Sequence, residues 1–478
     1  AMAAARMAPA PALKSHAALD AELAAQAGTR GRLLLIGAAA IVVVAALLLP
    51  PIDGTPIFAY LAIAAVLVGT IATKPVIAPG LLRPLARAVA AGRRPPVPSW
   101  LALQRLAATP RFAAIGVAGV SASFALMIAM ATMVTSFRAS VDAWLGQMLP
   151  ADLYVRAAPP GVESNFPASD LARIAAADGV ARVDFGRTRL FSIDPEKPPL
   201  TLIARRIDRQ DPGRTLPIVA IAPGAAPGAA VPAPAYVSEA AAALHGLRLG
   251  DTIAMALAGH DTAWRIAGTW RDYARQGGSV AVDIDDYRRA TGDATCSEAA
   301  LWIAPGHSAQ RVGEELAARL LDTQAVIAAP GEIRAVTLRV FDRSFAVTNL
   351  VEVAAIAIGL AGIGATFSVQ AITRRHEFGV LRHVGVTRRQ ILLVLAIESL
   401  VATLLAVALG TIAGLGAAAI LVDVVNPQSF HWTMDLRFPW PTIGALAGAT
   451  LAAAVATAVV AGRGAIAADA VLAVREDW

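Results

Sequence analysis

The chain alternates between long apolar runs and polar stretches, and this alternation predicts most of its architecture. About 20 consecutive apolar residues are enough for a helix to cross the hydrocarbon core of a bilayer. We therefore predict transmembrane helices in the apolar runs 33–49, 57–73, 113–135, 346–371, 391–422 and 441–462. The third and fourth runs bracket about two hundred polar and mixed residues, which are enough for a folded domain.

The loops between these runs indicate the orientation of the chain. Cytoplasmic loops of membrane proteins carry an excess of Lys and Arg. Segment 74–112 holds seven such residues and neither Asp nor Glu, so we place it in the cytoplasm. Alternating from there, the hairpin 372–390 and both termini are cytoplasmic, whereas 136–345 and 423–439 lie on the other side.

The predicted fold class is an α-helical integral membrane protein with one large extracytoplasmic mixed α/β domain inserted between two transmembrane helices. The expected parts are a cytoplasmic N-terminal segment (1–31), a transmembrane helix pair (32–73), a basic cytoplasmic linker (74–112), a transmembrane helix (113–135), a periplasmic α/β domain (136–345), three transmembrane helices with a cytoplasmic hairpin (346–462, with the hairpin at 372–390) and a cytoplasmic tail (463–478). The expected location is the bacterial inner membrane.

Composition agrees with a protein that is part membrane and part aqueous domain. The chain is 56% hydrophobic and 16% charged, with a mean hydropathy of +0.59. Residues 138–345 hold 22 Lys and Arg against 24 Asp and Glu, and the rest holds 19 against 11. The net charge of +6 thus belongs to the membrane part, and no nucleic-acid partner is expected. The single cysteine, Cys296, excludes an intrachain disulfide.

Within the inserted domain, local patterns predict mixed α/β structure. Residues 182–193 alternate as a strand does, and 252–257 and 264–270 are predicted to pair as strands. A helix is expected to open within Ala235–Glu239 and run to His245, and the Pro- and Gly-rich stretch 212–234 is expected to be a flexible connection.

The hairpin is the densest concentration of charge beside the apolar runs. Its basic residues are Arg374, Arg375, Arg382, Arg388 and Arg389. Such arginines can bind an acidic groove of a partner, Glu377 can pair with a partner's arginine or cap its own helix, and Gly379 and Gly385 permit tight turns. The alternative is that these arginines only follow the positive-inside rule.

Two acidic residues lie within the predicted spans, Glu352 near the outer end of the fourth run and Glu398 early in the fifth. A charge facing lipid is costly, so each is expected to face protein or the interface, in structural pairing rather than in a proton relay. The spacing of Gly410 with Gly414, and of Gly444 with Gly448, permits close helix packing.

No catalytic set and no metal site is predicted. The histidines of the inserted domain are scattered, and its aromatic residues Trp264, Trp270, Tyr273 and Trp302 fit either core packing or a ligand surface. The sequence contains no Gly-x-x-x-x-Gly-Lys-Ser/Thr phosphate loop, so ATP binding of that kind is not expected in this chain.

Two stretches resemble a known family. The pattern Arg-Arg-x-Glu-x-Gly-x-Leu-Arg-x-x-Gly at 374–385, which includes Leu381, is followed by Thr387-Arg388-Arg389-Gln390-Ile391 and Glu398, and it resembles the FtsX-like permease domain. Residues 236–239 and 246–252 resemble the periplasmic domain of permeases of the MacB and LolC kind. Long members carry two permease units, so the chain is expected to be the C-terminal portion of such a member.

The resemblance implies a permease subunit of an ABC transporter of the mechanotransmission type. The hairpin 372–390 would dock on a separate ABC ATPase subunit, which would bind ATP and Mg²⁺, since no cofactor is expected in this chain. The helices at 113–135 and 346–371 would transmit movement to the outer domain, for export or extraction of lipid, lipoprotein or another envelope substrate. Membrane lipids, a periplasmic adaptor or hydrolase, and a second permease unit or a second copy are the further partners it implies.

Two other functions remain open from the sequence. The same coupling could switch a periplasmic hydrolase on and off instead of transporting a substrate. The chain could also be a membrane sensor or anchor without an ATPase.

Overall fold

The structure is a computed structural model that describes residues 29–52, 54–92, 96–108, 118–158, 164–223, 232–257, 259–320, 325–344 and 346–467. The chain divides into two compact units. The helical unit comprises 1–135, 347–425 and 436–478, and the inserted unit comprises 136–346 and 426–435. Each unit is therefore discontinuous in sequence.

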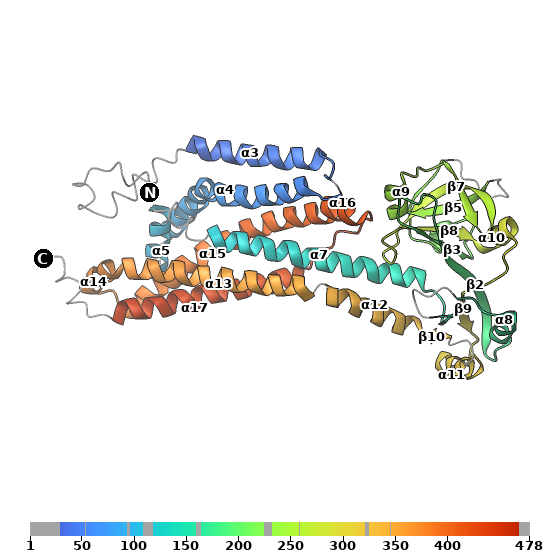
Figure 1. The fold of residues 1–478 in the computed structure, drawn as a ribbon. Helices are drawn as coiled ribbons and strands as arrows, with labels where there is room; N and C mark the ends of the chain where they lie inside the picture. The colour runs from blue at the N-terminus through green and yellow to red at the C-terminus, as the bar shows by residue number, and fades with distance from the viewer. Residues whose placement is uncertain are drawn as a thin grey trace. The chain divides into compact units, whose positions relative to one another are not determined.

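The helical unit is built from long apolar helices (Figure 1). They are α3 (Thr29–Leu48), α4 (Ile57–Ala90), α5 (Val97–Ala108), α7 (Ala118–Met148), α13 (Ala346–Thr373), α15 (Arg388–Ile420) and α17 (Trp440–Ala467), with the short α14 (Arg375–His383) before α15. Within the described residues, four stretches are long and apolar enough to cross a membrane: Ile57–Lys74, Ala118–Met148, Arg388–Phe430 and Trp440–Gly464. Leu33–Leu48 forms a shorter apolar helix, and the predicted run 346–371 lies in α13.

Segment 74–112, expected to be a linker after a span that ends near residue 73, begins as a continuation of that span. Helix α4 runs on to Ala90 through Pro75, Pro79 and Pro84. Proline removes a helical hydrogen bond, but hydroxyl groups and neighbouring helices can compensate. Helix α4 packs against α5 and α15. The predicted span ended near residue 73, but the helix does not end there.

Close packing of α15 on α7 depends on two of the four glycines noted in the sequence. A Cβ at Gly410 would lie 2.8 Å from the Ser121 carbonyl oxygen, and one at Gly414 would lie 2.7 Å from that of Ala125. By contrast, a Cβ at Gly444 or Gly448 on α17 would meet no atom of the described residues within 4 Å. The expectation of close packing is thus confirmed for the first pair and wrong for the second.

The inserted unit is a mixed α/β domain around one long sheet. Its strands are β1 (Leu153–Arg156), β2 (Val180–Phe191), β3 (Leu200–Arg205), β4 (Ile218–Ile221), β5 (Ala233–Ser238), β6 (Thr252–Leu257), β7 (His260–Trp270), β8 (Ser279–Asp283), β9 (Glu298–Ile303) and β10 (Val326–Ala328). The order is β10-β1-β9-β2-β3-β8-β5-β7-β4, with β6 paired to β7. Its helices are α8 (Ala168–Ala175), α9 (Glu239–His245), α10 (Ile284–Thr291), α11 (Ala309–Arg319), α12 (Pro330–Ser344) and α16 (Asn426–Phe430), and the 3₁₀ turn η2 covers Pro212–Arg214.

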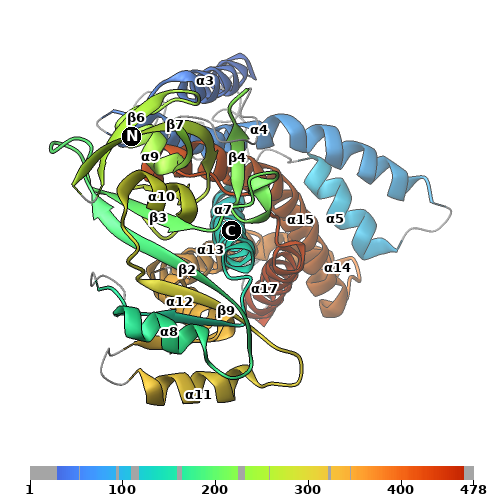
Figure 2. The same cartoon turned by 90° about the vertical axis from the view of Figure 1, so that its right-hand side faces the viewer.

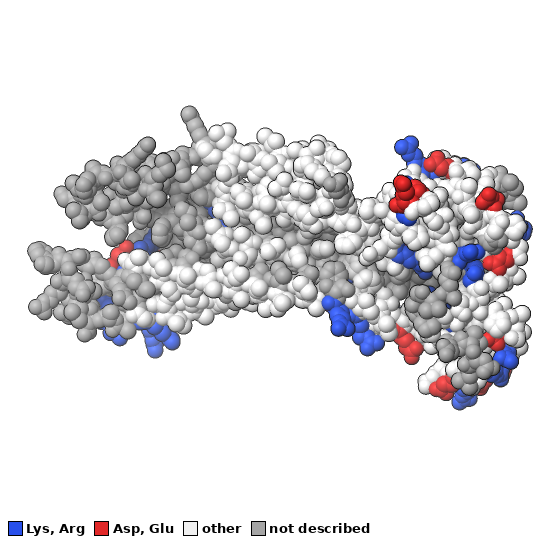
Figure 3. Space-filling model, viewed as in Figure 1, with Lys and Arg blue, Asp and Glu red and all other residues white. Residues whose placement is uncertain are grey.

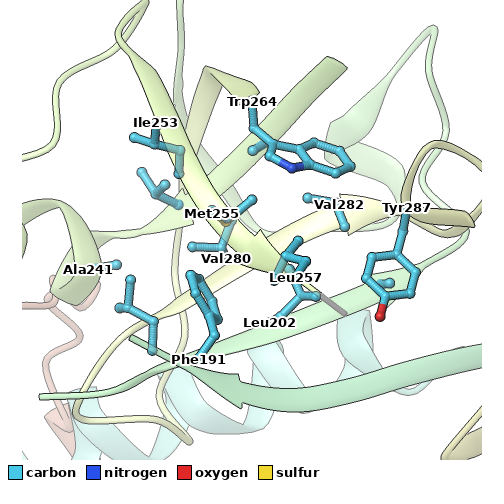
Figure 4. Packing of buried hydrophobic residues seen from close by; sticks show 14 of the residues in the cluster. Phe191, Leu202, Ala241, Ile253, Met255, Leu257, Trp264, Val280, Val282 and Tyr287 are labelled. Carbon is cyan, nitrogen blue, oxygen red and sulfur yellow. The ribbon is translucent and has the colours of Figure 1, made fainter. Parts of the chain in front are cut away.

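Strand β2 belongs to two parts of this sheet, as Figure 2 shows. Residues 180–186 pair with β9, and residues 187–191 pair with β3. Each part has its own core. Leu301 and Ile174 are buried in the part with α8 and α11. Trp264, Met255 and Tyr287 are buried in the part with α9 and α10 (Figure 4).

Several local predictions for this unit can now be compared with the structure. The strand predicted at 182–193 is present as β2. Residues 252–257 do pair with β7, but only Thr252 and Ile253 pair within 264–270, and the other four pair with residues 260–263. The helix expected within 235–239 begins only at Glu239. The preceding residues form β5, and the Ser238 hydroxyl caps α9 by accepting from the Ala241 amide at 3.1 Å. The stretch 212–234 contains a 3₁₀ turn and β4, which pairs with β7, so it is more than a connection.

Of the four aromatic residues considered in the sequence, three are core residues. Trp264 and Trp270 are fully buried and Tyr273 is nearly so. Trp302 instead has the Arg182 guanidinium 4.4 Å from its ring centroid, a cation–π contact. Cys296 is a buried free thiol.

We predict that Gly414→Ala destabilises the helical unit although alanine favours helices. The added methyl group would overlap the α7 backbone, and overpacking costs about 1–3 kcal/mol. Thermal unfolding of the purified protein in detergent measures this. The matched control is Gly416→Ala on the same helix, where the methyl group meets no atom within 4 Å in the part of the chain that the structure describes. Equal unfolding temperatures for both variants would contradict the close contact.

Candidate functional site

The predicted hairpin corresponds to helix α14 and its junction with α15. The helix ends in a Schellman motif, in which the Gly385 amide donates to the Arg382 carbonyl at 3.1 Å and the Val386 amide donates to the Leu381 carbonyl at 3.0 Å. Gly385 has φ +97°, a left-handed conformation that favours glycine. Its predicted role in a tight turn is therefore explained.

Helix α15 starts immediately after this motif. The Thr387 hydroxyl accepts from the Gln390 amide at 3.3 Å, and the Gln390 side chain accepts from the Thr387 amide at 2.8 Å. These two bonds form a capping box. Because each helix end is closed by its own motif, the connection between α14 and α15 has little freedom to bend.

An apolar face of α14 packs on the helical unit. Phe378 is 2% exposed and lies in a cluster with Ile391 and Leu395 of α15, and Leu381 and Val386 pack against the same cluster. Val386 and Ile391 flank the start of α15 in the positions of a hydrophobic staple. This face fixes the angle between the two helices.

Four charged side chains join α14, α15 and α5. Arg374, at the start of α14, is bidentate on Glu398, with Nη1–Oε2 and Nη2–Oε1 distances of 2.5 and 3.2 Å. Both side chains are less than a tenth exposed. Arg105 of α5 is bidentate on Glu377, with Nη2–Oε1 at 3.0 Å, and its Nε lies 4.0 Å from Glu398. We name Arg105, Arg374, Glu377 and Glu398 the ionic clamp.

The clamp is balanced in charge, with two arginines and two carboxylates. Burial raises the pKa of Glu377, but the hydrogen bond and charge of Arg105, with a smaller effect of Arg374, outweigh it and leave the pKa below its ordinary value. Glu377 therefore stays ionised near neutral pH. The clamp holds the first turn of α14 against two other helices.

The opposite face of α14 and its turn are exposed. Val384 is 78% exposed and Val380 is 48% exposed, which is high for valine. Arg388 and Arg389, at the start of α15, are also exposed, and Arg382 is half-buried. This face combines apolar side chains with positive charge, as protein interfaces do.

The structure places the predicted site residues on different faces. Arg374 and Glu377, expected to contact a partner, are paired within the chain, and so is Glu398, whose structural pairing was expected. Leu381 and Gly379 lie on the packed side of α14. The side chains of Arg375 and Glu352 are outside the described residues.

Sequence reasoning missed two features of this site. Arg105 is 272 residues from Glu377 in sequence, and it was noted only as one of several basic residues in 74–112. The exposed Val380 and Val384 were not singled out. Their spacing could have indicated a shared surface, because residues at i and i+4 lie on the same face of a helix.

In Figure 3, uncharged residues cover most of the visible surface of the helical unit, with charged residues near its α14 end, and charged residues of both signs are spread over the inserted unit. Residues 349–469, which contain α14, α15, α17 and most of α13, match the family model described as FtsX-like permease C-terminal. This match identifies residues 349–469 as an FtsX-like permease C-terminal region. The chain is a membrane protein with an inserted α/β domain.

The chain is 25% identical over 337 residues to an uncharacterised ABC transporter permease protein of Mycobacterium tuberculosis. The match covers 68% of this chain and 39% of the relative, so the chain spans about two fifths of the relative's length.

Two solved structures of extracytoplasmic domains also match. One is the extracellular domain of the noncanonic ABC-type transporter YknZ from Gram-positive bacteria, with a TM-score of 0.26 and 14% identity, covering 37% of this chain and 98% of that one. The other is the periplasmic region of MacB from Actinobacillus actinomycetemcomitans, with a TM-score of 0.28 and 11% identity, covering 40% of this chain and 95% of that one.

We predict that Glu398→Gln destabilises the helical unit by about 3 kcal/mol, because it leaves Arg374 buried without a counter-charge. Chemical or thermal unfolding in detergent measures the loss. Arg389→Gln is the control, because this exposed residue of the same helix should change stability by no more than about 0.5 kcal/mol. Similar losses in the two variants would show that the clamp does not stabilise α14.

The pH dependence of Glu377 gives a second test of the clamp. Its folded-state pKa is lowered, so its contribution to stability is present above the ordinary pKa and is lost as the pH falls through the lowered folded-state pKa. We expect the difference in unfolding temperature between wild type and Glu377→Gln to be full at pH 7 and to shrink in acid. A difference that does not depend on pH would exclude this ion pair as its cause.

Proposed function

We propose that this chain is the membrane subunit of an ABC transporter in which a separate ATPase drives the exposed face of α14. ATP and Mg²⁺ would be bound by that partner chain. The inserted unit would lie on the extracytoplasmic side and move with the ATPase cycle. The substrate class best supported is a lipid, lipoprotein or other envelope molecule.

One observation carries this proposal, namely that α14 is rigidly fixed on one side and exposed on the other. The ionic clamp and the Phe378 cluster bind its inner side to α5 and α15. The two capping motifs restrict bending at the junction, so α14 and α15 would move together. A force applied to the exposed Val380 and Val384 would therefore act directly on a membrane-crossing helix.

The charge around α14 supports a cytoplasmic location and an acidic partner. Arg388 and Arg389 are exposed beside the valines, and basic loops lie on the cytoplasmic side of membranes. Arginine binds carboxylates through two parallel hydrogen bonds, so an acidic groove on the ATPase fits this surface. Positive charge would guide docking, and the valines would supply contact area.

The composition of the spans supports the substrate class. The span Arg388–Phe430 has a mean hydropathy of 2.6, and the buried carboxylate Glu398 on it is paired with Arg374. A hydrophilic pathway through the bilayer would need polar groups facing a cavity. Work on a molecule outside the membrane, or on one drawn from it, needs none.

We predict that the double variant Arg388→Glu, Arg389→Glu stops co-purification with the ABC ATPase of the same gene cluster and removes permease-dependent ATP hydrolysis. Reversal of two exposed charges should weaken docking by at least tenfold, since a close charge pair at an interface contributes about 1.5 kcal/mol or more. The control is Arg463→Glu, an exposed arginine on α17.

Stability measurements separate docking from folding in this experiment. The double variant should unfold at the wild-type temperature, unlike variants of the ionic clamp. If no ATPase associates with the wild type, or if the double variant behaves like Arg463→Glu, the transporter function proposed here is wrong.

A further inference from the structure

The ten residues 426–435 between α15 and α17 belong to the inserted unit and not to the helical unit. We name them the strap. The strap starts with α16 and continues as an extended segment. The chain enters it through a π-helical turn, Leu421–Val425, and leaves it shortly before α17 at Trp440. Such π-helical turns within a helix are frequent at functional sites.

The backbone and side chain of Thr433 are bound by the inserted unit. The Glu239 carboxylate of α9 accepts from the Thr433 amide at 3.0 Å and from its hydroxyl at 2.7 Å. The Tyr273 hydroxyl donates to the Thr433 carbonyl at 2.9 Å. Burial raises the pKa of Tyr273 to about 12, so this hydroxyl keeps its proton at neutral pH. Every polar group of Thr433 is thus engaged.

Asp435 is held by a second set of hydrogen bonds, next to those of Thr433. Arg271 donates from Nη1 to the Asp435 carboxylate at 2.9 Å and from Nε to the Thr433 hydroxyl at 3.2 Å. The Asp435 amide donates to the Ser140 hydroxyl of α7 at 3.1 Å. Charge-assisted hydrogen bonds such as those of Glu239 and Arg271 are stronger than bonds between neutral groups.

Between the two ends of the strap, Trp432 inserts into an aromatic cluster. Its ring centroid lies 4.9 Å from that of Tyr273 and 5.3 Å from that of Phe137, and only 7% of Trp432 is exposed. Phe137 of α7 also meets Phe341 of α12, at 5.1 Å. Trp432 therefore joins α7 to the segment after β7, and Phe137 extends the same cluster to α12.

The strap also has a defined shape of its own. His431 adopts φ +62° and turns the chain sharply after α16. The Asn426 side chain closes this turn by donating to the Trp432 carbonyl at 2.7 Å. A loop that only joined two membrane helices would need no such order, because its polar groups could be hydrated.

We propose that the strap is a positioning element that fastens the outer end of α15 to the inserted unit, with Glu239 and Arg271 as the positioning residues. This inference rests on the proposed function for its role in transport. Helix α15 begins at the α14 junction and leads, through the π-helical turn, into the strap. Movement of α14 would thus reach the inserted unit through α15 as well as through α7 and the segment from α12 to α13.

The first experiment measures, without any ATPase, how firmly the strap is held against the rest of the inserted unit. Spin labels are placed at Ser429→Cys on the strap and Arg206→Cys on the exposed surface of the inserted unit, in the full chain in lipid nanodiscs. Pulsed electron resonance should give one narrow distance distribution. The variant Glu239→Gln, Arg271→Gln should broaden it, whereas Arg156→Gln, which removes a surface ion pair with Glu298, should not. A distribution that stays narrow in the double variant overturns the fastening.

The second experiment tests the route with the partner ATPase bound. In the wild type, the distance between strap and inserted unit should be the same before and after trapping with ATP and vanadate. In the double variant it should change on trapping, because α15 would move without the inserted unit following. An unchanged distance in the double variant overturns the positioning role, and failure of the wild type to bind an ATPase would instead count against the proposed function.

A charge exchange separates positioning from a general loss of structure. Arg271→Glu alone should broaden the distribution, and Arg271→Glu combined with Asp435→Arg should narrow it again by restoring an ion pair. If the combined variant is as broad as the single one, Arg271 does not act through Asp435.

Discussion

A buried charge must have a partner, and this constraint organises the helical unit. Glu398 lies in a long apolar helix, where an unpaired carboxylate would cost several kcal/mol. Arg374 satisfies it through two hydrogen bonds, and this requires the first residues of α14 to lie against α15. Arg105 extends the pairing to α5 through Glu377. This arrangement, together with the Phe378 cluster, holds α14 against the helical unit.

In the inserted unit, one sheet contributes side chains to two separate hydrophobic cores. Strand β2 is long enough to pair with β9 along its first half and with β3 along its second. Side chains of each half enter a separate core, such as Phe185 in one and Phe191 in the other. The two parts of the unit therefore share covalent backbone through their sheet and not only a surface contact.

Much of the fold was predictable because its signals are local. Apolar length indicated the helices, alternation indicated β2 and the β6–β7 pair, and the spacing of Gly410 and Gly414 indicated the contact with α7. The family pattern indicated α14. The glycine pair on α17 shows the limit of such spacing, since Gly444 and Gly448 meet no neighbouring atom within 4 Å in the described part of the chain. A spacing of small residues permits close helix packing, but the position of the neighbouring helix determines whether such packing occurs.

The rest depends on contacts between residues far apart in sequence. Nothing near Arg105 indicates Glu377, and nothing near Thr433 indicates Glu239, which lies 194 residues earlier. The apolar run that predicted this span ends near residue 73, whereas helix α4 continues through three prolines to Ala90 and packs against α5 and α15. Arg374, which was expected to contact a partner, is bidentate on Glu398 of this chain.

The discontinuous boundary of the inserted unit has a practical consequence for protein engineering. A fragment cut at residues 136 and 346 would look complete by sequence but would lack residues 426–435. The rings of Phe137 and Tyr273 would then lose their contacts with Trp432. Glu239 and Arg271 would lose their hydrogen bonds with Thr433 and Asp435. An excised fragment would accordingly need residues 426–435 grafted onto it by a short linker to keep its native surface.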